Sequence, residues 1–185
     1  MSSNLEKALG FNLEAFNYLY VLCDYETLLK KNITLENFLE ILKKYDVKLL
    51  QYRDKVSDLE LQKQNLIFLK QNLNIPIIVN DKVELIDYAD GLHVGQDDVL
   101  KIDKDKNLAI KLLRKRVKNK LLGISTHNEL EILEANNFEL DMIGLGAYKA
   151  TNTKDISNIL GEKLQYLAKI SKHPVCAIGG VKVDD

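Results

Sequence analysis

The polar segment Gln51-Tyr52-Arg53-Asp54-Lys55 directly follows the apolar run Val47 to Leu50. If that run is a β-strand, its two-residue period sends Gln51, Arg53 and Lys55 to the same side. One amide and two cations would then lie together. Arginine binds phosphate oxygens as a planar fork and lysine binds them as a mobile point charge. The segment therefore predicts a phosphate site, although a solvated strand end would contain the same residues.

Two aspartates follow the next two apolar runs. Asp81 comes after Ile75 to Val79, and Asp98 comes after Gly91 to Gly95. Magnesium prefers hard oxygen ligands and takes one or two protein carboxylates, leaving its other positions to water and substrate phosphate. We therefore predict Asp81 and Asp98 as magnesium ligands. Each also has a simpler interpretation, since Asp98 could cap a helix and Asp81 could begin a turn.

Three later predicted strand ends carry groups that could also bind phosphate. Ser125 could donate to a phosphate oxygen or cap the helix that follows it. The loop with Thr151, Thr153 and Lys154 combines two hydroxyls and a cation, which predicts a phosphate grip. Gly179-Gly180 would let backbone amides approach a phosphate, although a diglycine after a strand is also common in tight turns.

Short apolar runs rich in Val, Ile, Leu and Tyr predict the strands that position these residues. The seven predicted strands are Tyr18–Cys23, Val47–Tyr52, Ile75–Val79, Gly91–Gly95, Leu121–Ile124, Met142–Gly146 and Val175–Ile178. Between them, apolar residues recur at three- and four-residue intervals, as in amphipathic helices. The predicted helices are Thr34–Tyr45, Asp58–Leu73, Asn107–Val117, Asn128–Ala135 and Ile156–Ile170, with a short one at Val83–Tyr88.

Strict alternation of strands and helices, with strands apolar on both faces, predicts an α/β fold with a buried parallel sheet. With seven such units, a TIM-type (β/α)8 barrel is favoured over a doubly wound sheet. The sequence ends at Asp185, soon after the seventh strand, so we expect the barrel to lack its eighth β/α unit. We expect one domain over residues 1–185. An open barrel edge could be covered by a flanking helix or by a second copy in a homo-oligomer.

The chain has almost no net charge, so any binding of anions must depend on a local group of cations. Lys+Arg 26 against Asp+Glu 27 gives a formal net charge of -1, so no global field draws the chain to nucleic acid or to a membrane. A basic run contains Lys111, Arg114, Lys115, Arg116, Lys118 and Lys120. It lacks interleaved aromatic residues and is interpreted as a solvated face. Cys23 and Cys176 are expected to be buried free thiols of a reducing compartment, which favours a cytoplasmic location.

Seven segments, in order along nearly the whole chain, carry a family resemblance. They are Gln51-Tyr52-Arg53-Asp54-Lys55, Val79-Asn80-Asp81, Asp90 to Asp98, Gly123 to His127, Gly144-Leu145-Gly146, Thr151-Asn152-Thr153-Lys154 and Ala177-Ile178-Gly179-Gly180. Together they resemble thiamine phosphate synthase, within the superfamily that also contains the thiazole tautomerases. The resemblance implies a transferase that joins an aminopyrimidine methyl pyrophosphate to a thiazole phosphate, giving thiamine phosphate and pyrophosphate.

The resemblance also implies a role for each matching residue. The pyrimidine pyrophosphate would be held by Gln51, Arg53, Lys55, Asn80, Ser125 and Lys154, of which Arg53, Lys55 and Lys154 would act on the departing pyrophosphate. Asp81 and Asp98 would hold Mg²⁺. Thr151, Thr153 and Gly180 would hold the thiazole phosphate. In the family's mechanism pyrophosphate leaves first and the thiazole nitrogen captures the resulting pyrimidine methyl cation, so no protein nucleophile is needed.

Two alternatives stay open beside the synthase. A thiazole tautomerase would rely on an acid or base such as His127, but it needs no magnesium-pyrophosphate site, and this chain keeps both aspartates. An impaired paralogue could bind thiamine precursors without turning them over. Two departures motivate that alternative: the absent eighth unit, and the segment Ala147 to Ala150 where the family usually has a proline-containing loop. For His127 we also expect a helix-start or supporting role, and for His93 a buried position within a strand.

Overall fold

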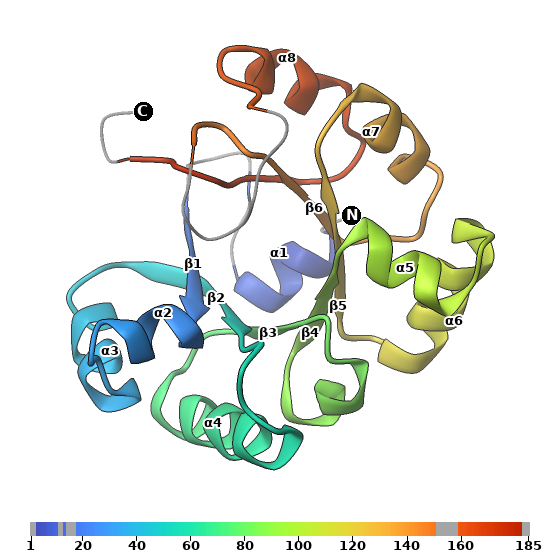
Figure 1. Cartoon of the computed structure of the whole chain (residues 1–185). Coiled ribbons are helices and arrows are strands. Elements are labelled where there is room, and N and C mark those ends of the chain that lie inside the picture. Colours follow the sequence, from blue (N-terminus) through green and yellow to red (C-terminus); the bar gives the residue numbers. More distant parts are fainter. Residues whose placement is uncertain (1–2, 11–12, 14–17, 151–158, 183–185) are drawn as a thin grey trace. The chain divides into compact units, whose positions relative to one another are not determined.

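The computed structural model describes residues 3–10, 13, 18–150 and 159–182. The chain divides into two compact units, Met1–His93 with Asn119–Leu121, and Val94–Lys118 with Leu122–Asp185. Along the described residues seven strands alternate with helices, as Figure 1 shows in sequence colours. The predicted α/β class is confirmed, with seven strands in the part of the chain that the structure describes.

The first unit contains the first four strands, and their recorded pairs are all parallel. Helices α2, α3 and α4 lie together on the same side of β1, β2 and β3 in Figure 1. The elements of this unit, with β4 at its boundary, are α1 (Asn4–Leu9), β1 (Leu19–Asp24), α2 (Tyr25–Lys30), α3 (Leu35–Leu42), β2 (Val47–Arg53), α4 (Leu59–Asn72), β3 (Ile77–Asn80), the 3-10 helix η2 (Val83–Tyr88) and β4 (Gly91–Val94).

The second unit contains the later strands, and β6 pairs in parallel with both β5 and β7. In this unit α5 packs beside α6, and α7 packs beside α8. Its elements are α5 (Gln96–Ile102), α6 (Lys106–Val117), β5 (Leu121–Thr126), which begins at the boundary, α7 (Glu129–Ala135), β6 (Met142–Leu145), α8 (Lys163–Ile170) and β7 (Val175–Ala177).

Strands β2 to β6 are largely buried because their side chains are apolar on both faces, as expected for parallel sheets covered by helices, whereas β1 and β7 are partly exposed. In the first unit Leu50, Ile77 and Ile78 are fully buried, and Leu66 and Leu69 of α4 pack into the same core. A strand that is buried on both faces presents its polar side chains mainly where it ends. This restricts the candidate functional residues to the strand ends and the turns that follow them.

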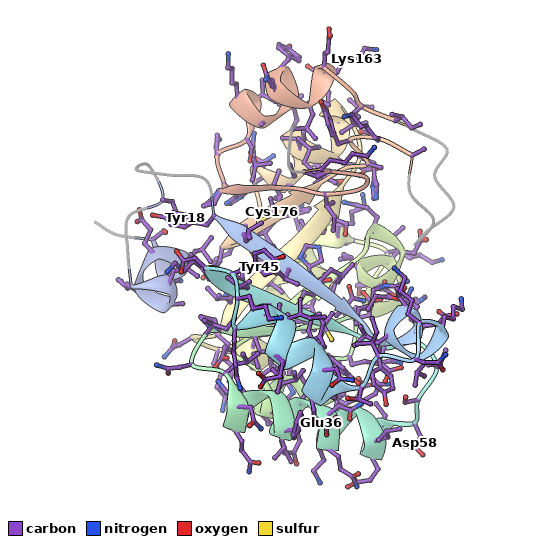
Figure 2. The ribbon with its side chains drawn as sticks, turned by 90° about the vertical axis from the view of Figure 1, so that its left-hand side faces the viewer. Tyr18, Glu36, Tyr45, Asp58, Lys163 and Cys176 are labelled. Atoms are coloured by element: carbon purple, nitrogen blue, oxygen red, sulfur yellow. The ribbon has the colours of Figure 1, made fainter. Side chains whose placement is uncertain are left out.

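Local capping residues set where the helices begin. The side chains of Thr34 and Asn128 accept hydrogen bonds from the first-turn amides of α3 and α7. Asp58 caps α4 in the same way, with its Oδ1 2.8 Å from the Leu61 amide nitrogen. Figure 2 marks Glu36 near the start of α3 and Asp58 at the start of α4. Capping removes the penalty of unpaired amides at a helix start, so each turn after a strand has a defined end.

The predicted helix Ile156–Ile170 is wrong at its start, because α8 begins at Lys163. Residues 156–158 lie outside the described part of the chain. Leu160 donates its amide to the Ala147 carbonyl at 2.8 Å, and Gly161 has a φ of +51°. Both features are incompatible with a helix that runs through these residues. Helices α2 and α5 were not predicted, since six or seven residues carry too short a periodic signal.

Four of the six residues of the basic run are exposed, in line with its interpretation as a solvated face, whereas Arg114 and Lys120 are partly buried. The Arg114 Nη2 atom donates to the Glu139 carbonyl at 3.0 Å and to the Asp141 carboxylate at 2.8 Å. Lys120 donates from Nζ to the Ile86 and Ala89 carbonyls at 2.6 and 2.7 Å. These two cations hold loops between elements, and this role needs no nucleic acid.

Both cysteines are free thiols, as expected. Cys23 is fully buried, and its burial, with the nearby charges of Asp24 and Asp54, raises its pKa to about 12. Cys176, labelled in Figure 2, is only partly buried, so the expectation of burial was wrong for this residue. Among the described helices, none is both long and apolar enough to cross a membrane.

His93 lies inside β4 and is buried, as expected. Burial disfavours its charged form and lowers its pKa to about 4. An unfolded histidine titrates near pH 6.5. As the pH falls below that value the unfolded chain gains a proton that the folded chain does not, so this stability contribution is complete above about pH 6.5 and is lost toward pH 4.

We expect the free energy of unfolding to fall by about 3 kcal/mol between pH 6.5 and pH 4 on account of His93. Urea unfolding followed by circular dichroism at several pH values measures it. His93→Leu should flatten this dependence. An unchanged pH dependence in His93→Leu would contradict the assignment.

Candidate active site

The ends of β1 and β2 join Arg53 to an acidic partner. The parallel register places Asp24 opposite Arg53, and the Arg53 guanidinium donates from Nη1 to Asp24 Oδ2. Both side chains are largely buried, at 15% and 9% exposure. The Arg53 guanidinium is therefore already paired with a carboxylate at the strand end. Its position is fixed, and part of its charge is balanced, before any ligand arrives.

Asp24 also begins α2. Its Oδ1 accepts hydrogen bonds from the Thr27 amide at 3.0 Å and the Thr27 hydroxyl at 2.6 Å. Burial alone would raise the pKa of Asp24, but the Thr27 hydrogen bonds and the Arg53 guanidinium together lower it. An ionised carboxylate with donors on both oxygens can hold a guanidinium in one orientation.

Gln51 is buried two residues before Arg53, and it too contacts β1. Its Nε2 donates to the Tyr20 hydroxyl at 2.6 Å. Since a buried amide without a partner would be costly, this bond fixes which way the Gln51 side chain points.

Lys55 and Asp81 lie together beyond the ends of β2 and β3. The Lys55 Nζ is 3.8 Å from Asp81 Oδ2, with side-chain exposures of 53% and 19%. Asp81 has a φ of +61°, a conformation that costs most residues but that Asp and Asn tolerate. Its amide donates to the His93 carbonyl at 2.8 Å, which ties the turn after β3 to β4. Asn80, the last residue of β3, pairs with His93 and is partly exposed.

Asp98 belongs to the second unit and lies in the first turn of α5. It does not cap this helix, because the residue at the cap is Gly95 and no side chain bonds there. Asp98 Oδ1 is 2.8 Å from Lys101 Nζ. A Cβ atom added to Gly95 would lie 3.0 Å from Asp98 Oδ2, so glycine leaves room for the carboxylate at the start of α5.

Ser125 lies near the end of β5, opposite Gly144 of β6. The cap of α7 is Asn128, so the structure excludes Ser125 as that cap. The Ser125 carbonyl accepts a hydrogen bond from Gln96 Nε2 at 2.7 Å. His127 has a helix-start role, since its amide and its Nδ1 lie 2.8 and 2.9 Å from Glu131 Oε2.

Gly180 supports a close approach of two backbone segments. The amides of Tyr148 and Lys149 donate to the carbonyls of Ile178 and Gly179 at 3.0 and 2.8 Å. Gly180 has a φ of +68°, and a Cβ there would lie 2.7 Å from the Ala150 carbonyl oxygen. Both conditions require glycine. The chain after Ala150 lies outside the described residues as far as position 158. This part includes Thr151, Thr153 and Lys154.

Asp81 of the first unit and Asp98 of the second are the carboxylates that the sequence predicts as magnesium ligands. Within the described residues, no three or more His, Cys, Asp and Glu side chains gather into a metal-binding group. Magnesium needs only one or two protein carboxylates when phosphate oxygens and water supply the rest. Asp81 and Asp98 provide hard oxygen donors of the required kind.

Comparison with known proteins identifies the family. The family model for thiamine monophosphate synthase matches residues 19–185. The chain belongs to this family. The match begins at the first residue of β1, and it therefore includes every strand that the structure describes.

Individual members of the synthase family show the same relation. The chain is 35% identical to a thiamine-phosphate synthase of Persephonella marina over 71% of this chain and 62% of that protein. It is 37% identical to that of Chloroflexus aurantiacus over 71% of this chain and 60% of that protein. The chain thus spans less than two thirds of these two relatives. For the synthase of Staphylococcus saprophyticus the identity is 30%, over 90% of this chain and 79% of that protein.

A solved member supports the fold assignment. The structure of thiamine phosphate pyrophosphorylase from Pyrococcus furiosus matches with a TM-score of 0.71 and 25% sequence identity, covering 94% of this chain and 80% of that one. Together with the parallel strands and interleaved helices, this match confirms the predicted TIM-type fold class.

Asp24 is the candidate-site residue that sequence reasoning missed. The signal was present, because Asp24 closes a strand and precedes a short helix, the usual place of a capping residue. Its second role, as the partner of an arginine 29 residues away, depends on strand pairing and could not be read locally.

We expect Asp24→Asn to lower the free energy of unfolding at pH 7 by on the order of 1 kcal/mol, because it weakens a largely buried hydrogen-bonded pair. Since the folded-state pKa of Asp24 is lowered, its contribution is present above the ordinary aspartate pKa near 4 and is lost as the pH falls further. The difference between variant and wild type should therefore shrink in acid. Urea unfolding at pH 7 and pH 3 tests this.

Asp46→Asn is the matched control, because Asp46 pairs with Lys48 at the surface with 81% exposure. An exposed pair contributes little, so this variant should unfold like wild type. Equal losses in the two variants would contradict a special role for Asp24.

Proposed function

We propose that this chain condenses 4-amino-2-methyl-5-(diphosphooxymethyl)pyrimidine with thiazole phosphate in a magnesium-dependent reaction, giving thiamine phosphate and pyrophosphate. The observation that carries the proposal is the approach of the Lys55 ammonium to the Asp81 carboxylate, 3.8 Å apart at neighbouring strand ends, in a chain of the thiamine monophosphate synthase family. In such an arrangement the cation can contact the pyrophosphate oxygens while the carboxylate contacts the metal ion bound to them.

Asp81 and Asp98 are the proposed magnesium ligands. Their side chains are mostly but not fully buried, at 19% and 28% exposure, so solvent and substrate can still reach them. Magnesium would add positive charge next to the pyrophosphate oxygens, which stabilises the charge that develops when pyrophosphate leaves.

The cations Arg53, Lys55 and Lys154 are the proposed partners of the leaving pyrophosphate. In the proposed step the bond between the pyrimidine methylene carbon and the pyrophosphate oxygen breaks, and its electron pair goes to the pyrophosphate. The thiazole nitrogen then gives its lone pair to the methylene carbon. Arg53 is held by Asp24 in a largely buried setting, so it needs little reorganisation to meet the developing charge.

The remaining proposed contacts divide between the two substrates. Gln51, Asn80 and Ser125 would help to bind the pyrimidine pyrophosphate, and Gln51 is already oriented by its bond to Tyr20. Thr151, Thr153 and Gly180 would hold the thiazole phosphate. No thiol is needed as a nucleophile, which agrees with the raised pKa of the buried Cys23. A single domain, a homo-oligomer and a cytoplasmic location stay predictions.

A release assay tests the proposal. With both phosphorylated precursors and magnesium, the purified chain should release pyrophosphate and form thiamine phosphate. Asp81→Asn keeps a residue that tolerates the positive φ, and Asp98→Asn keeps the side-chain volume, so each removes charge with little change of shape. Each should raise the magnesium concentration needed for half-maximal activity by on the order of 10- to 100-fold.

Asp97→Asn is the control, since Asp97 neighbours Asp98 in the same first turn of α5 and is exposed. It should leave the magnesium requirement within about twofold of wild type. If neither Asp81→Asn nor Asp98→Asn changes that requirement, the metal assignment is wrong. If wild type releases no pyrophosphate from the two precursors, the synthase proposal is wrong, and turnover of a thiazole carboxylate phosphate would favour the tautomerase instead.

A further inference from the structure

A buried polar cluster adjoins the turn that contains Lys55. It consists of Tyr52, Asp54 and Asn65. These residues are 1%, 4% and 8% exposed. The Tyr52 hydroxyl donates to Asp54 Oδ2 at 2.8 Å and accepts from Asn65 Nδ2 at 2.9 Å. The cluster therefore joins the end of β2 to the middle of α4.

The other oxygen of Asp54 holds the turn that follows β2. Its Oδ1 accepts from the amides of Val56 and Ser57 at 3.0 and 2.9 Å. The Ser57 carbonyl in turn accepts from Gln62 Nε2 at 2.8 Å, and Gln62 is 2% exposed. The turn is thus fixed at both ends, by β2 and by α4.

Lys55 lies in the segment that the Asp54 carboxylate holds in place. Asp54 precedes it, and the Val56 amide after it is bonded to Asp54 Oδ1. The Lys55 side chain itself is 53% exposed, and its Nζ is 3.8 Å from Asp81 Oδ2. The lysine side chain is a flexible four-carbon stem, so a backbone that is fixed at residue 55 limits the region that the ammonium can reach.

We propose that Asp54 is a positioning residue, which orients the Lys55 ammonium toward the pyrophosphate-binding end of β3. The inference rests on the proposed function, because it assigns Lys55 a pyrophosphate to bind. Asp54 does not itself touch the ligand: it is buried, and each of its oxygens already accepts hydrogen bonds within the protein.

The cluster requires a carboxylate at position 54. Asparagine has one oxygen and one amide group, whereas this site presents a hydroxyl donor on one side and two amide donors on the other. If the asparagine oxygen bonds the two amides, its Nδ2 faces a Tyr52 hydroxyl that already accepts from Asn65. The Tyr52 proton then loses its acceptor, and the Val56 and Ser57 amides bond a neutral oxygen in place of a carboxylate oxygen. Asp54→Asn therefore weakens the hold on the turn while it keeps the side-chain volume.

A double-mutant cycle tests the inference, with binding of inorganic pyrophosphate plus magnesium measured by calorimetry. Asp54→Asn should weaken this binding about tenfold when Lys55 is present, because the ammonium is no longer held in place. In the Lys55→Ala background the same change should alter binding by less than about twofold. In turnover, Asp54→Asn should raise the half-saturating concentration of the pyrimidine pyrophosphate and leave that of thiazole phosphate unchanged.

Asp58→Asn is the matched control. It removes a carboxylate charge from the same turn, but asparagine caps α4 as well as aspartate does. Pyrophosphate binding should stay at the wild-type value. Tyr52→Phe, which removes only the hydroxyl that donates to Asp54, is the milder variant if Asp54→Asn fails to fold, and it should weaken binding in the same Lys55-dependent way.

Hydrogen exchange gives an independent readout, since the Val56 and Ser57 amides should exchange faster in Asp54→Asn. Equal losses of pyrophosphate binding with and without Lys55 would overturn the inference, as would wild-type protein that does not bind pyrophosphate. Wild type that binds pyrophosphate through Lys55 but forms no thiamine phosphate would contradict the proposed function alone.

Discussion

The parallel register of β1, β2 and β3 is the constraint on which the first unit's part of the candidate site depends. It sets Asp24 opposite Arg53 and Tyr52 opposite Val79, and a slip of one residue would turn every side chain of β2 to the other face. Because β2 is buried on both sides, its polar side chains must find partners in the protein. Gln51 finds Tyr20, and Arg53 finds Asp24. The burial that stabilises the strand therefore also orients the groups at its end.

Much of this arrangement could be predicted because its signals are local. All seven strands were expected within two residues of their observed bounds, since each is a short apolar run with a polar end. The predicted helix starts at Thr34, Asp58 and Asn128 coincide with the observed capping residues. The grouping of Lys55 with Asp81 could be anticipated for the same reason: the ends of adjacent parallel strands lie at one edge of a sheet.

The rest depends on contacts between distant residues, which periodicity does not encode. Asp54 looks like an ordinary charge in a polar segment, yet in the fold it is 4% exposed and accepts a hydrogen bond from the Tyr52 hydroxyl. Asp24 was overlooked because α2 is a single short helix with no repeat to find. Ser125 and Asp98 each offered a capping role by position, and the backbone geometry assigns those caps to Asn128 and Gly95. Thr151, Thr153 and Lys154 lie outside the described residues, so their assignment still rests on the sequence.

Asp81 combines two properties at one position, a backbone with a positive φ and a negatively charged side chain. The backbone conformation suits glycine, asparagine and aspartate, whereas the negative charge is supplied by aspartate alone among these three. If Asp81 holds magnesium as proposed, a duplicated gene copy released from catalytic selection would drift at this position toward asparagine or glycine first, because those changes spare the fold. Selection on chemistry and selection on folding thus leave different marks at residue 81, and a paralogue's residue there tells which of the two still acts.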